Sequence, residues 1–99
     1  MASYIVKSEN NKINVIFEGK IDLIFANENS EAIIANFNNE NEVIFDFDKV
    51  DYISSAGLRL VLRTAKIVKE FSLINVSRDV YDIFDISGFT SIVNIKKAL

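Results

Sequence analysis

The side chains of this 99-residue chain that could do chemistry are hydroxyls and carboxylates, because the sequence holds no histidine and no cysteine. Their absence removes the commonest general base and excludes Ser-His-Asp and Cys-His arrangements. It also excludes a disulfide framework and a thiolate metal site. We therefore expect a protein that is not an enzyme and that carries no cofactor.

Two adjacent hydroxyls, those of Ser54 and Ser55, stand between an apolar stretch and an expected helix. The free N–H groups and the positive end of a helix dipole point at such a position. A phosphate placed on a serine there would be held in place. Serine is also a favoured helix cap, so the residues alone leave a capping role and a phosphorylation site both open.

Gly57 falls in the first turn of the same expected helix. Glycine there is unfavourable by roughly 1 kcal/mol relative to alanine. The close approach of another backbone, or of a partner protein, would account for it.

Acidic residues form two groups in the sequence. The groups are Asp46, Asp48 and Asp51, and Asp79, Asp82 and Asp85. The first group raises the possibility of a magnesium site, as in a phospho-aspartate receiver domain. We disfavour it because a receiver needs an acidic pair after its first strand, a late lysine and a longer chain. The second group, with its spacing of three, is typical of a solvated helix face.

The elements that position these residues are indicated by apolar periodicity. Alternation of apolar and polar residues predicts two strands, one around Tyr4 and Val6 and one around Ile13, Val15 and Phe17. We expect a turn at Asn10-Asn11 between them, and Gly19 at the end of the second strand. We then expect a helix over Ala26–Phe37 capped by Asn27 or Asn29, a buried strand over Glu42–Phe47 and a connecting segment over Asp48–Ile53.

The second half of the chain predicts the longest helix. We expect helix Ala56–Phe71, strand Leu73–Val76, helix Arg78–Ile86 with Ser77 as cap and Gly88 as stop, and strand Ser91–Ile95. The apolar arc of the long helix is Leu58, Val61, Leu62, Ala65 and Val68. A second stripe is Leu60, Thr64, Ile67 and Phe71. We expect the stripe to belong to the core; the alternative is that Leu60 and Thr64 join a partner surface.

The predicted order is β-β-α-β-α-β-α-β, an α/β fold in one domain over residues 1–99. The sheet is mixed and mostly parallel, with an N-terminal hairpin and three helices. The net charge of −3 argues against nucleic acid as the main partner. No apolar run approaches the ~18 residues that span a bilayer, and the N-terminus lacks a signal-peptide pattern, so we expect a cytoplasmic protein without a membrane partner.

The segment Ser54-Ser55-Ala56-Gly57-Leu58 resembles the signature of the STAS family of bacterial anti-sigma factor antagonists. The family pattern is a buried strand and a short loop, then D-S-[S/T/A]-G-[L/I] opening a helix. Two flanking motifs extend the resemblance: Glu18-Gly19-Lys20-Ile21-Asp22 is similar to the family's G-x-[L/I/V]-D, and Asn75-Val76-Ser77 through Ser87-Gly88-Phe89 is similar to its C-terminal part.

The resemblance implies a switch between protein partners. The unphosphorylated antagonist binds an anti-sigma factor that is also a GHKL-type serine kinase, which frees a sigma factor. The kinase then phosphorylates the serine that matches Ser55, and a PP2C-type phosphatase restores the binding form. Ser54 stands where the family often has aspartate, and it is the second candidate for the phosphosite. The alternative is a constitutive STAS scaffold without covalent switching, and we expect a monomer or weak dimer.

The partner-binding residues that the resemblance implies surround the two serines. They are Asp22, Ser54, Ser55, Ala56, Gly57, Leu58, Arg59 and Leu60. Asp22 has an equally good alternative interpretation as a turn residue.

Overall fold

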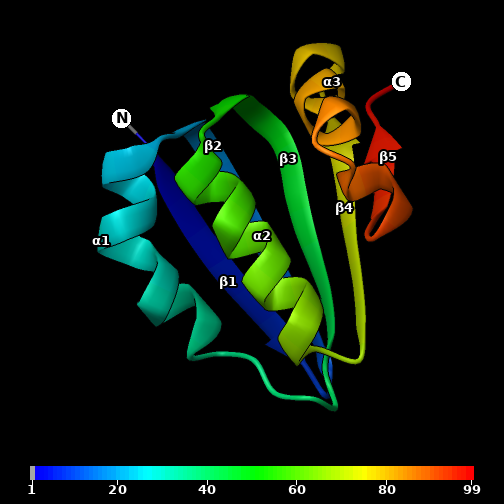
Figure 1. The fold of residues 1–99 in the computed structure, drawn as a ribbon. Helices are drawn as coiled ribbons and strands as arrows, with labels where there is room; N and C mark the ends of the chain where they lie inside the picture. The colour runs from blue at the N-terminus through cyan, green and yellow to red at the C-terminus, as the bar shows by residue number, and fades with distance from the viewer. Residues whose placement is uncertain (1) are drawn as a thin grey trace.

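A computed structural model describes residues 2–99, which form one five-stranded sheet with three α-helices on one of its faces (Figure 1). The elements are β1 (Ser3–Glu9), β2 (Lys12–Ile21), α1 (Leu23–Ile34), β3 (Glu42–Ile53), α2 (Ser55–Ile67), β4 (Glu70–Val76), α3 (Arg78–Ile86), the 3-10 turn η1 (Phe89–Ser91) and β5 (Asn94–Lys97). The predicted order of strands and helices is confirmed. Within these residues, no helix is long and apolar enough to cross a membrane.

The sheet order is β1-β2-β3-β4-β5, with β3 in the centre. β1 and β2 form the predicted antiparallel hairpin, and Asn10 supplies its turn with a φ of 56°. The remaining neighbours are parallel. Right-handed crossovers between neighbouring parallel strands place their helices on the same face of the sheet. The carboxyl ends of β2 and β3 therefore meet at one edge, each followed by the start of a helix.

The core lies between the helices and alternate residues of the central strands. The inward side chains of β2 and β3 are Ile13, Val15, Phe17, Val43, Phe45 and Phe47, none more than 5% exposed. The ring centroid of Phe17 lies 4.9 Å from that of Phe45 and 5.4 Å from that of Phe47, with the rings edge to face. Edge-to-face pairs add to the stabilisation from burial alone. This aromatic layer fixes the strands that carry the two helix starts.

β3 is longer than predicted, because residues 48–53 continue the strand and do not form a connecting segment. Lys49 pairs with Glu18, and Tyr52 pairs with Lys20. Register shifts interrupt this pairing, so the buried side chains Val50 and Ile53 are three residues apart. A β-bulge breaks the two-residue alternation by which a strand is recognised in a sequence.

The first helix was also misplaced by the sequence prediction. α1 begins at Leu23 after its cap Asp22, and neither Asn27 nor Asn29 caps it. Asn29 instead donates its side-chain N–H to the Phe25 carbonyl inside the helix, at 2.9 Å. The apolar residues of the first turn, Leu23 and Ile24, are exposed, so the amphipathic pattern starts late.

α2 ends at Ile67, earlier than the predicted Phe71, because Val68 adopts an extended conformation. Phe71 lies in β4, which begins at Glu70 and not at Leu73, and its ring packs 4.8 Å from that of Phe45. The last strand, β5, covers Asn94–Lys97 and overlaps only the end of the predicted Ser91–Ile95, because η1 occupies residues 89–91. The Ser77 cap is confirmed, since its Oγ accepts the Val80 N–H at 3.3 Å.

Candidate functional site

α1 and α2 begin side by side at the edge where β2 and β3 end (Figure 1). The Ser54 N–H donates to the Ile21 carbonyl at 2.9 Å and joins the two strand ends. The next residue after Ile21 is the α1 cap, and Ser54 is itself the α2 cap. The positive ends of two helix dipoles therefore share one small region of the surface.

Ser54 and Ser55 have different environments. The Ser54 Oγ accepts the Gly57 N–H at 3.2 Å, and the Ser54 carbonyl accepts the Leu58 N–H at 2.9 Å. Ser55 is the first helical residue and is exposed. Within residues 2–99, the Ser55 hydroxyl has no hydrogen-bond partner in the protein. The capping role therefore belongs to Ser54, and the Ser55 hydroxyl is accessible to another molecule.

We expect the two serines to differ in their effect on stability. Ser54→Ala removes a cap and should lower the free energy of unfolding by about 1 kcal/mol. Ser55→Ala removes an exposed hydroxyl and should change it by less than about 0.5 kcal/mol. Urea unfolding of both variants and the unmodified protein measures the difference. Equal effects from the two substitutions would contradict the assignment of the cap to Ser54.

Gly57 is required by the packing of α2 against the ends of β2 and β3. A Cβ at this position would lie 2.6 Å from Ile53 Cγ1, 2.9 Å from Ile21 Cγ2 and 3.0 Å from the Ile21 carbonyl oxygen. These neighbours belong to β-branched, stiff side chains and to the backbone. The close approach predicted for this glycine is therefore made within the chain, and the glycine is buried.

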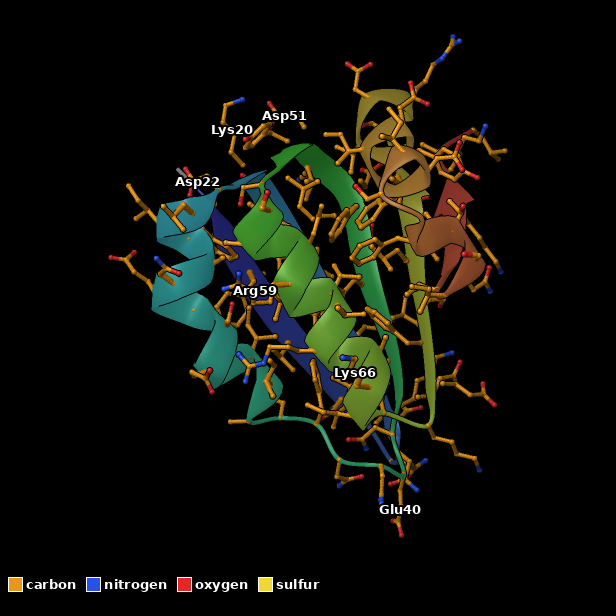
Figure 2. The ribbon with its side chains drawn as sticks, in the orientation of Figure 1. Lys20, Asp22, Glu40, Asp51, Arg59 and Lys66 are labelled. Carbon is orange, nitrogen blue, oxygen red and sulfur yellow. The ribbon has the colours of Figure 1, made fainter. Side chains whose placement is uncertain are left out.

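Asp22 is the cap of α1, because its Oδ1 accepts the Phe25 N–H at 2.8 Å. It also lines a surface hollow of about 390 Å³ together with Lys20, Ile24 and Asp51. Lys20 and Asp51 form an exposed ion pair at 3.6 Å within this edge. The labelled side chains of Lys20, Asp22 and Asp51 gather at the end of the sheet where α1 and α2 begin (Figure 2). Asp22 is thus a helix cap that also lies at the candidate site.

Three exposed apolar side chains at this edge were missed by sequence reasoning. Leu23 is 59% exposed, Ile24 is 67% exposed and Tyr52 is 42% exposed. Leu23 and Ile24 form the first turn of α1, and Tyr52 stands near the end of β3. A hydrophobic pair directly after a capping aspartate was the available signal. Exposed apolar residues grouped in this way are typical of a protein contact surface.

The remaining predicted contact residues separate into core and surface. Leu60 is 2% exposed, and we withdraw it from the contact surface because it packs in the core. Thr64 is fully buried and donates its hydroxyl to the Leu60 carbonyl at 2.9 Å, so these two members of the second stripe belong to the core, as expected. Ile67 is half-buried, and Phe71 lies in β4 and not on the helix. Ala56 and Leu58 are half-buried, and Arg59 is exposed.

The acidic residues before the site do not form one cluster. Asp46 projects on the sheet face opposite its buried neighbours Phe45 and Phe47, and its Oδ1 accepts hydrogen bonds from the Asp48 N–H and the Asn75 amide. Within the described part of the chain, no three acidic side chains converge as metal ligands would. The residues Asp79, Asp82 and Asp85 are all exposed on α3, which confirms the solvated face.

An exposed ion pair connects α1 to α2 below the site. Arg63 donates to the two carboxylate oxygens of Glu31 at 2.8 and 3.4 Å. These hydrogen bonds, together with charge attraction, lower the pKa of Glu31 below its ordinary value of 4.5. The same hydrogen bonds raise the pKa of Arg63.

We expect this pair to make a small, pH-dependent contribution to stability. Because folding lowers the Glu31 pKa, the contribution is present above the unfolded-state pKa and is lost as the pH falls through the folded one. Arg63→Gln should therefore lower the thermal unfolding midpoint at neutral pH, and the difference should narrow below pH 4.5. Lys66→Gln on the same helix is the control. A difference that persists unchanged in acid would contradict this role.

A profile of the STAS domain matches residues 4–99. A protein of Bordetella bronchiseptica, the candidate anti-sigma factor antagonist BtrV, is 46% identical over 57 residues, which cover 54% of this chain and 49% of that protein. The match thus spans about half the length of this curated relative.

Solved structures share the fold over almost the whole chain. A candidate anti-sigma factor antagonist from Thermotoga maritima superposes with a TM-score of 0.84 at 14% identity, covering 97% of this chain and 87% of that one. The anti-sigma factor antagonist SpoIIAA in its unphosphorylated form gives a TM-score of 0.75 at 16% identity, covering 94% and 87%. Because the sequence identities are this low, the structural similarity establishes the fold of this chain and nothing more.

Proposed function

Since this chain belongs to the STAS domain family, we propose that it is an anti-sigma factor antagonist switched at Ser55. In the unphosphorylated form, it binds an anti-sigma factor that is also a GHKL-type serine kinase, and a sigma factor is released. Phosphorylation of Ser55 ends this contact. The name of the Bordetella relative and the SpoIIAA structure, which is of an unphosphorylated form, both support the proposal. The protein acts by binding, in the cytoplasm.

The main support for the proposal is that the two serines have different roles in the structure. Ser54 caps α2 through the Gly57 N–H, whereas Ser55 has an exposed hydroxyl at the start of the same helix. A kinase can therefore modify Ser55 without removing the cap. This arrangement also accounts for the departure at Ser54, because serine and aspartate are equally good helix caps.

The covalent step transfers the γ-phosphoryl group of ATP to the Ser55 Oγ. A new O–P bond forms, the bond from the γ-phosphorus to the β,γ-bridging oxygen breaks, and ADP leaves with that electron pair. The hydroxyl proton passes to a base of the kinase. A PP2C-type phosphatase reverses the state with water, which yields the free hydroxyl and inorganic phosphate.

The surface around Ser55 explains how a phosphate would end binding. The exposed side chains of Leu23, Ile24 and Tyr52 supply apolar contact area at the same edge. A phosphate brings roughly −1.5 to −2 charges, which a partner covering these apolar groups would have to desolvate. A hundredfold loss of affinity requires only about 2.7 kcal/mol. Repulsion and desolvation suffice, with no refolding of the domain.

Affinity capture from a lysate of the source organism tests the proposal. The baits are the unmodified protein, the protein carrying phosphoserine at position 55, and a Ser55→Ala control, with bound proteins identified by mass spectrometry. We expect a GHKL-type kinase on the unmodified and alanine baits but not on the phosphorylated bait. If all three baits retain the same partner equally, the chain is a constitutive STAS scaffold and the covalent switch is wrong.

A further inference from the structure

Arg59 lies one helical turn after Ser55, on the side of α2 that faces α1 (Figure 2). Residues four apart on a helix share a face, and helical side chains tilt toward the N-terminus. The guanidinium of Arg59 can therefore reach back to the Ser55 side chain. Both residues are exposed, and Arg59 lines a shallow hollow between α1 and α2.

The other cations around the two helix starts are already paired with carboxylates. The pairs are Lys20 with Asp51 at 3.6 Å, Lys49 with Glu18 at 3.9 Å, and Arg63 with Glu31 at 2.8 Å. Within residues 2–99, Arg59 forms no ion pair. Arg59 is thus the cation left available to a new anion at this edge.

The backbone adds two further donors. Of the first-turn N–H groups of α2, that of Gly57 is bound by the Ser54 hydroxyl and that of Leu58 by the Ser54 carbonyl. The N–H groups of Ser55 and Ala56 have no acceptor one turn earlier in the helix. These two free N–H groups lie at the same helix start as the Ser55 side chain.

We infer that a phosphate on Ser55 is bound by Arg59 of the same chain, an inference that rests on the proposed function only for the presence of the phosphate. The pairing is a charge-assisted contact between a guanidinium fork and phosphate oxygens. Phosphorylation then changes the surface in two ways, because it adds an anion and also engages Arg59, a cation that a partner could otherwise contact. In this role, Arg59 holds the phosphate in position and takes part in no chemical step.

A phosphate titration tests the inference without any partner. Protein with phosphoserine installed at position 55 by an expanded genetic code is followed by phosphorus NMR over the pH range of the second phosphate ionisation. We expect the phosphate pKa to be lower by about 0.2 to 0.4 than in Arg59→Gln, because a neighbouring cation favours the dianion. The difference should largely disappear in about 1 M salt.

The control is Arg63→Gln, which removes a cation of the same helix that is already paired with Glu31. This variant should leave the phosphate pKa unchanged. The inference is overturned if Arg59→Gln leaves the pKa at its original value, or if Arg63→Gln raises it equally. Because the phosphoserine is installed during translation, the result does not depend on a kinase. A capture experiment that finds no partner would contradict the proposed function, but it would not affect the measured phosphate pKa difference between the unmodified protein and Arg59→Gln.

Discussion

Replacing Gly57 by valine should lower the free energy of unfolding by about 3 kcal/mol, the upper end of what overpacking a well-packed site produces. A single Cβ would already lie 2.6 Å from Ile53 Cγ1 and 3.0 Å from the Ile21 carbonyl oxygen. Valine adds two more methyl groups to this space. Because Ile21 and Ile53 end the two strands, relief of the clash must displace the start of α2 and with it Ser55.

Neighbouring Ala56 provides a matched control in the same helical turn. It is half-buried where Gly57 is buried, so Ala56→Val should change stability by roughly 0.5 kcal/mol, the difference in helix propensity. Urea unfolding of both variants measures the two effects. If both substitutions lower the free energy of unfolding by similarly small amounts, α2 does not need the close approach at Gly57.

The order of elements could be predicted because it depends on patterns that the core enforces. Phe17, Phe45 and Phe47 alternate with polar residues and are all buried in the aromatic layer. The Asn10-Asn11 turn and the Ser77 cap follow from local backbone chemistry. The two-residue alternation of a strand and the capping residue of a helix each depend on a short segment, so both can be recognised in the sequence alone.

The limits of the elements could not be predicted where tertiary contacts override the local pattern. β3 continues through residues 48–53 because β2 pairs with it across two register shifts. α1 starts at Leu23 although its first turn exposes two apolar residues. Leu60, which the resemblance places among the contact residues, is buried in the core. Each of these outcomes depends on a partner that is distant in the sequence.

The candidate site was located in the sequence, but its chemistry needed the geometry. The signature placed Ser54 and Ser55 before a helix, with capping and phosphorylation both open. The hydrogen bond between the Ser54 Oγ and the Gly57 N–H assigns the cap to Ser54. The exposed pair Leu23 and Ile24 became part of the site only because Ser54 bonds to the carbonyl of Ile21.

Phosphorylation of Ser55 should lower the affinity for the kinase partner by at least about a hundredfold, equivalent to ~2.7 kcal/mol. Leu23, Ile24 and Tyr52 are exposed at the same end of the sheet, so a partner that covered them together with Ser55 would have to desolvate the phosphate. Burying a dianion there opposes binding through desolvation and repulsion. Ser55→Ala adds no charge to this surface and should retain nearly full affinity.

Titration calorimetry is the sharpest test of the switch at Ser55. The captured kinase is purified and titrated against this protein with serine or with phosphoserine at position 55. Circular dichroism of both forms establishes that each is folded, so that a difference reports on the contact. We expect tight binding of the serine form and binding at least about a hundredfold weaker for the phosphoserine form. Equal affinities for the two folded proteins would contradict this expectation, because Ser55 would then lie outside any switch.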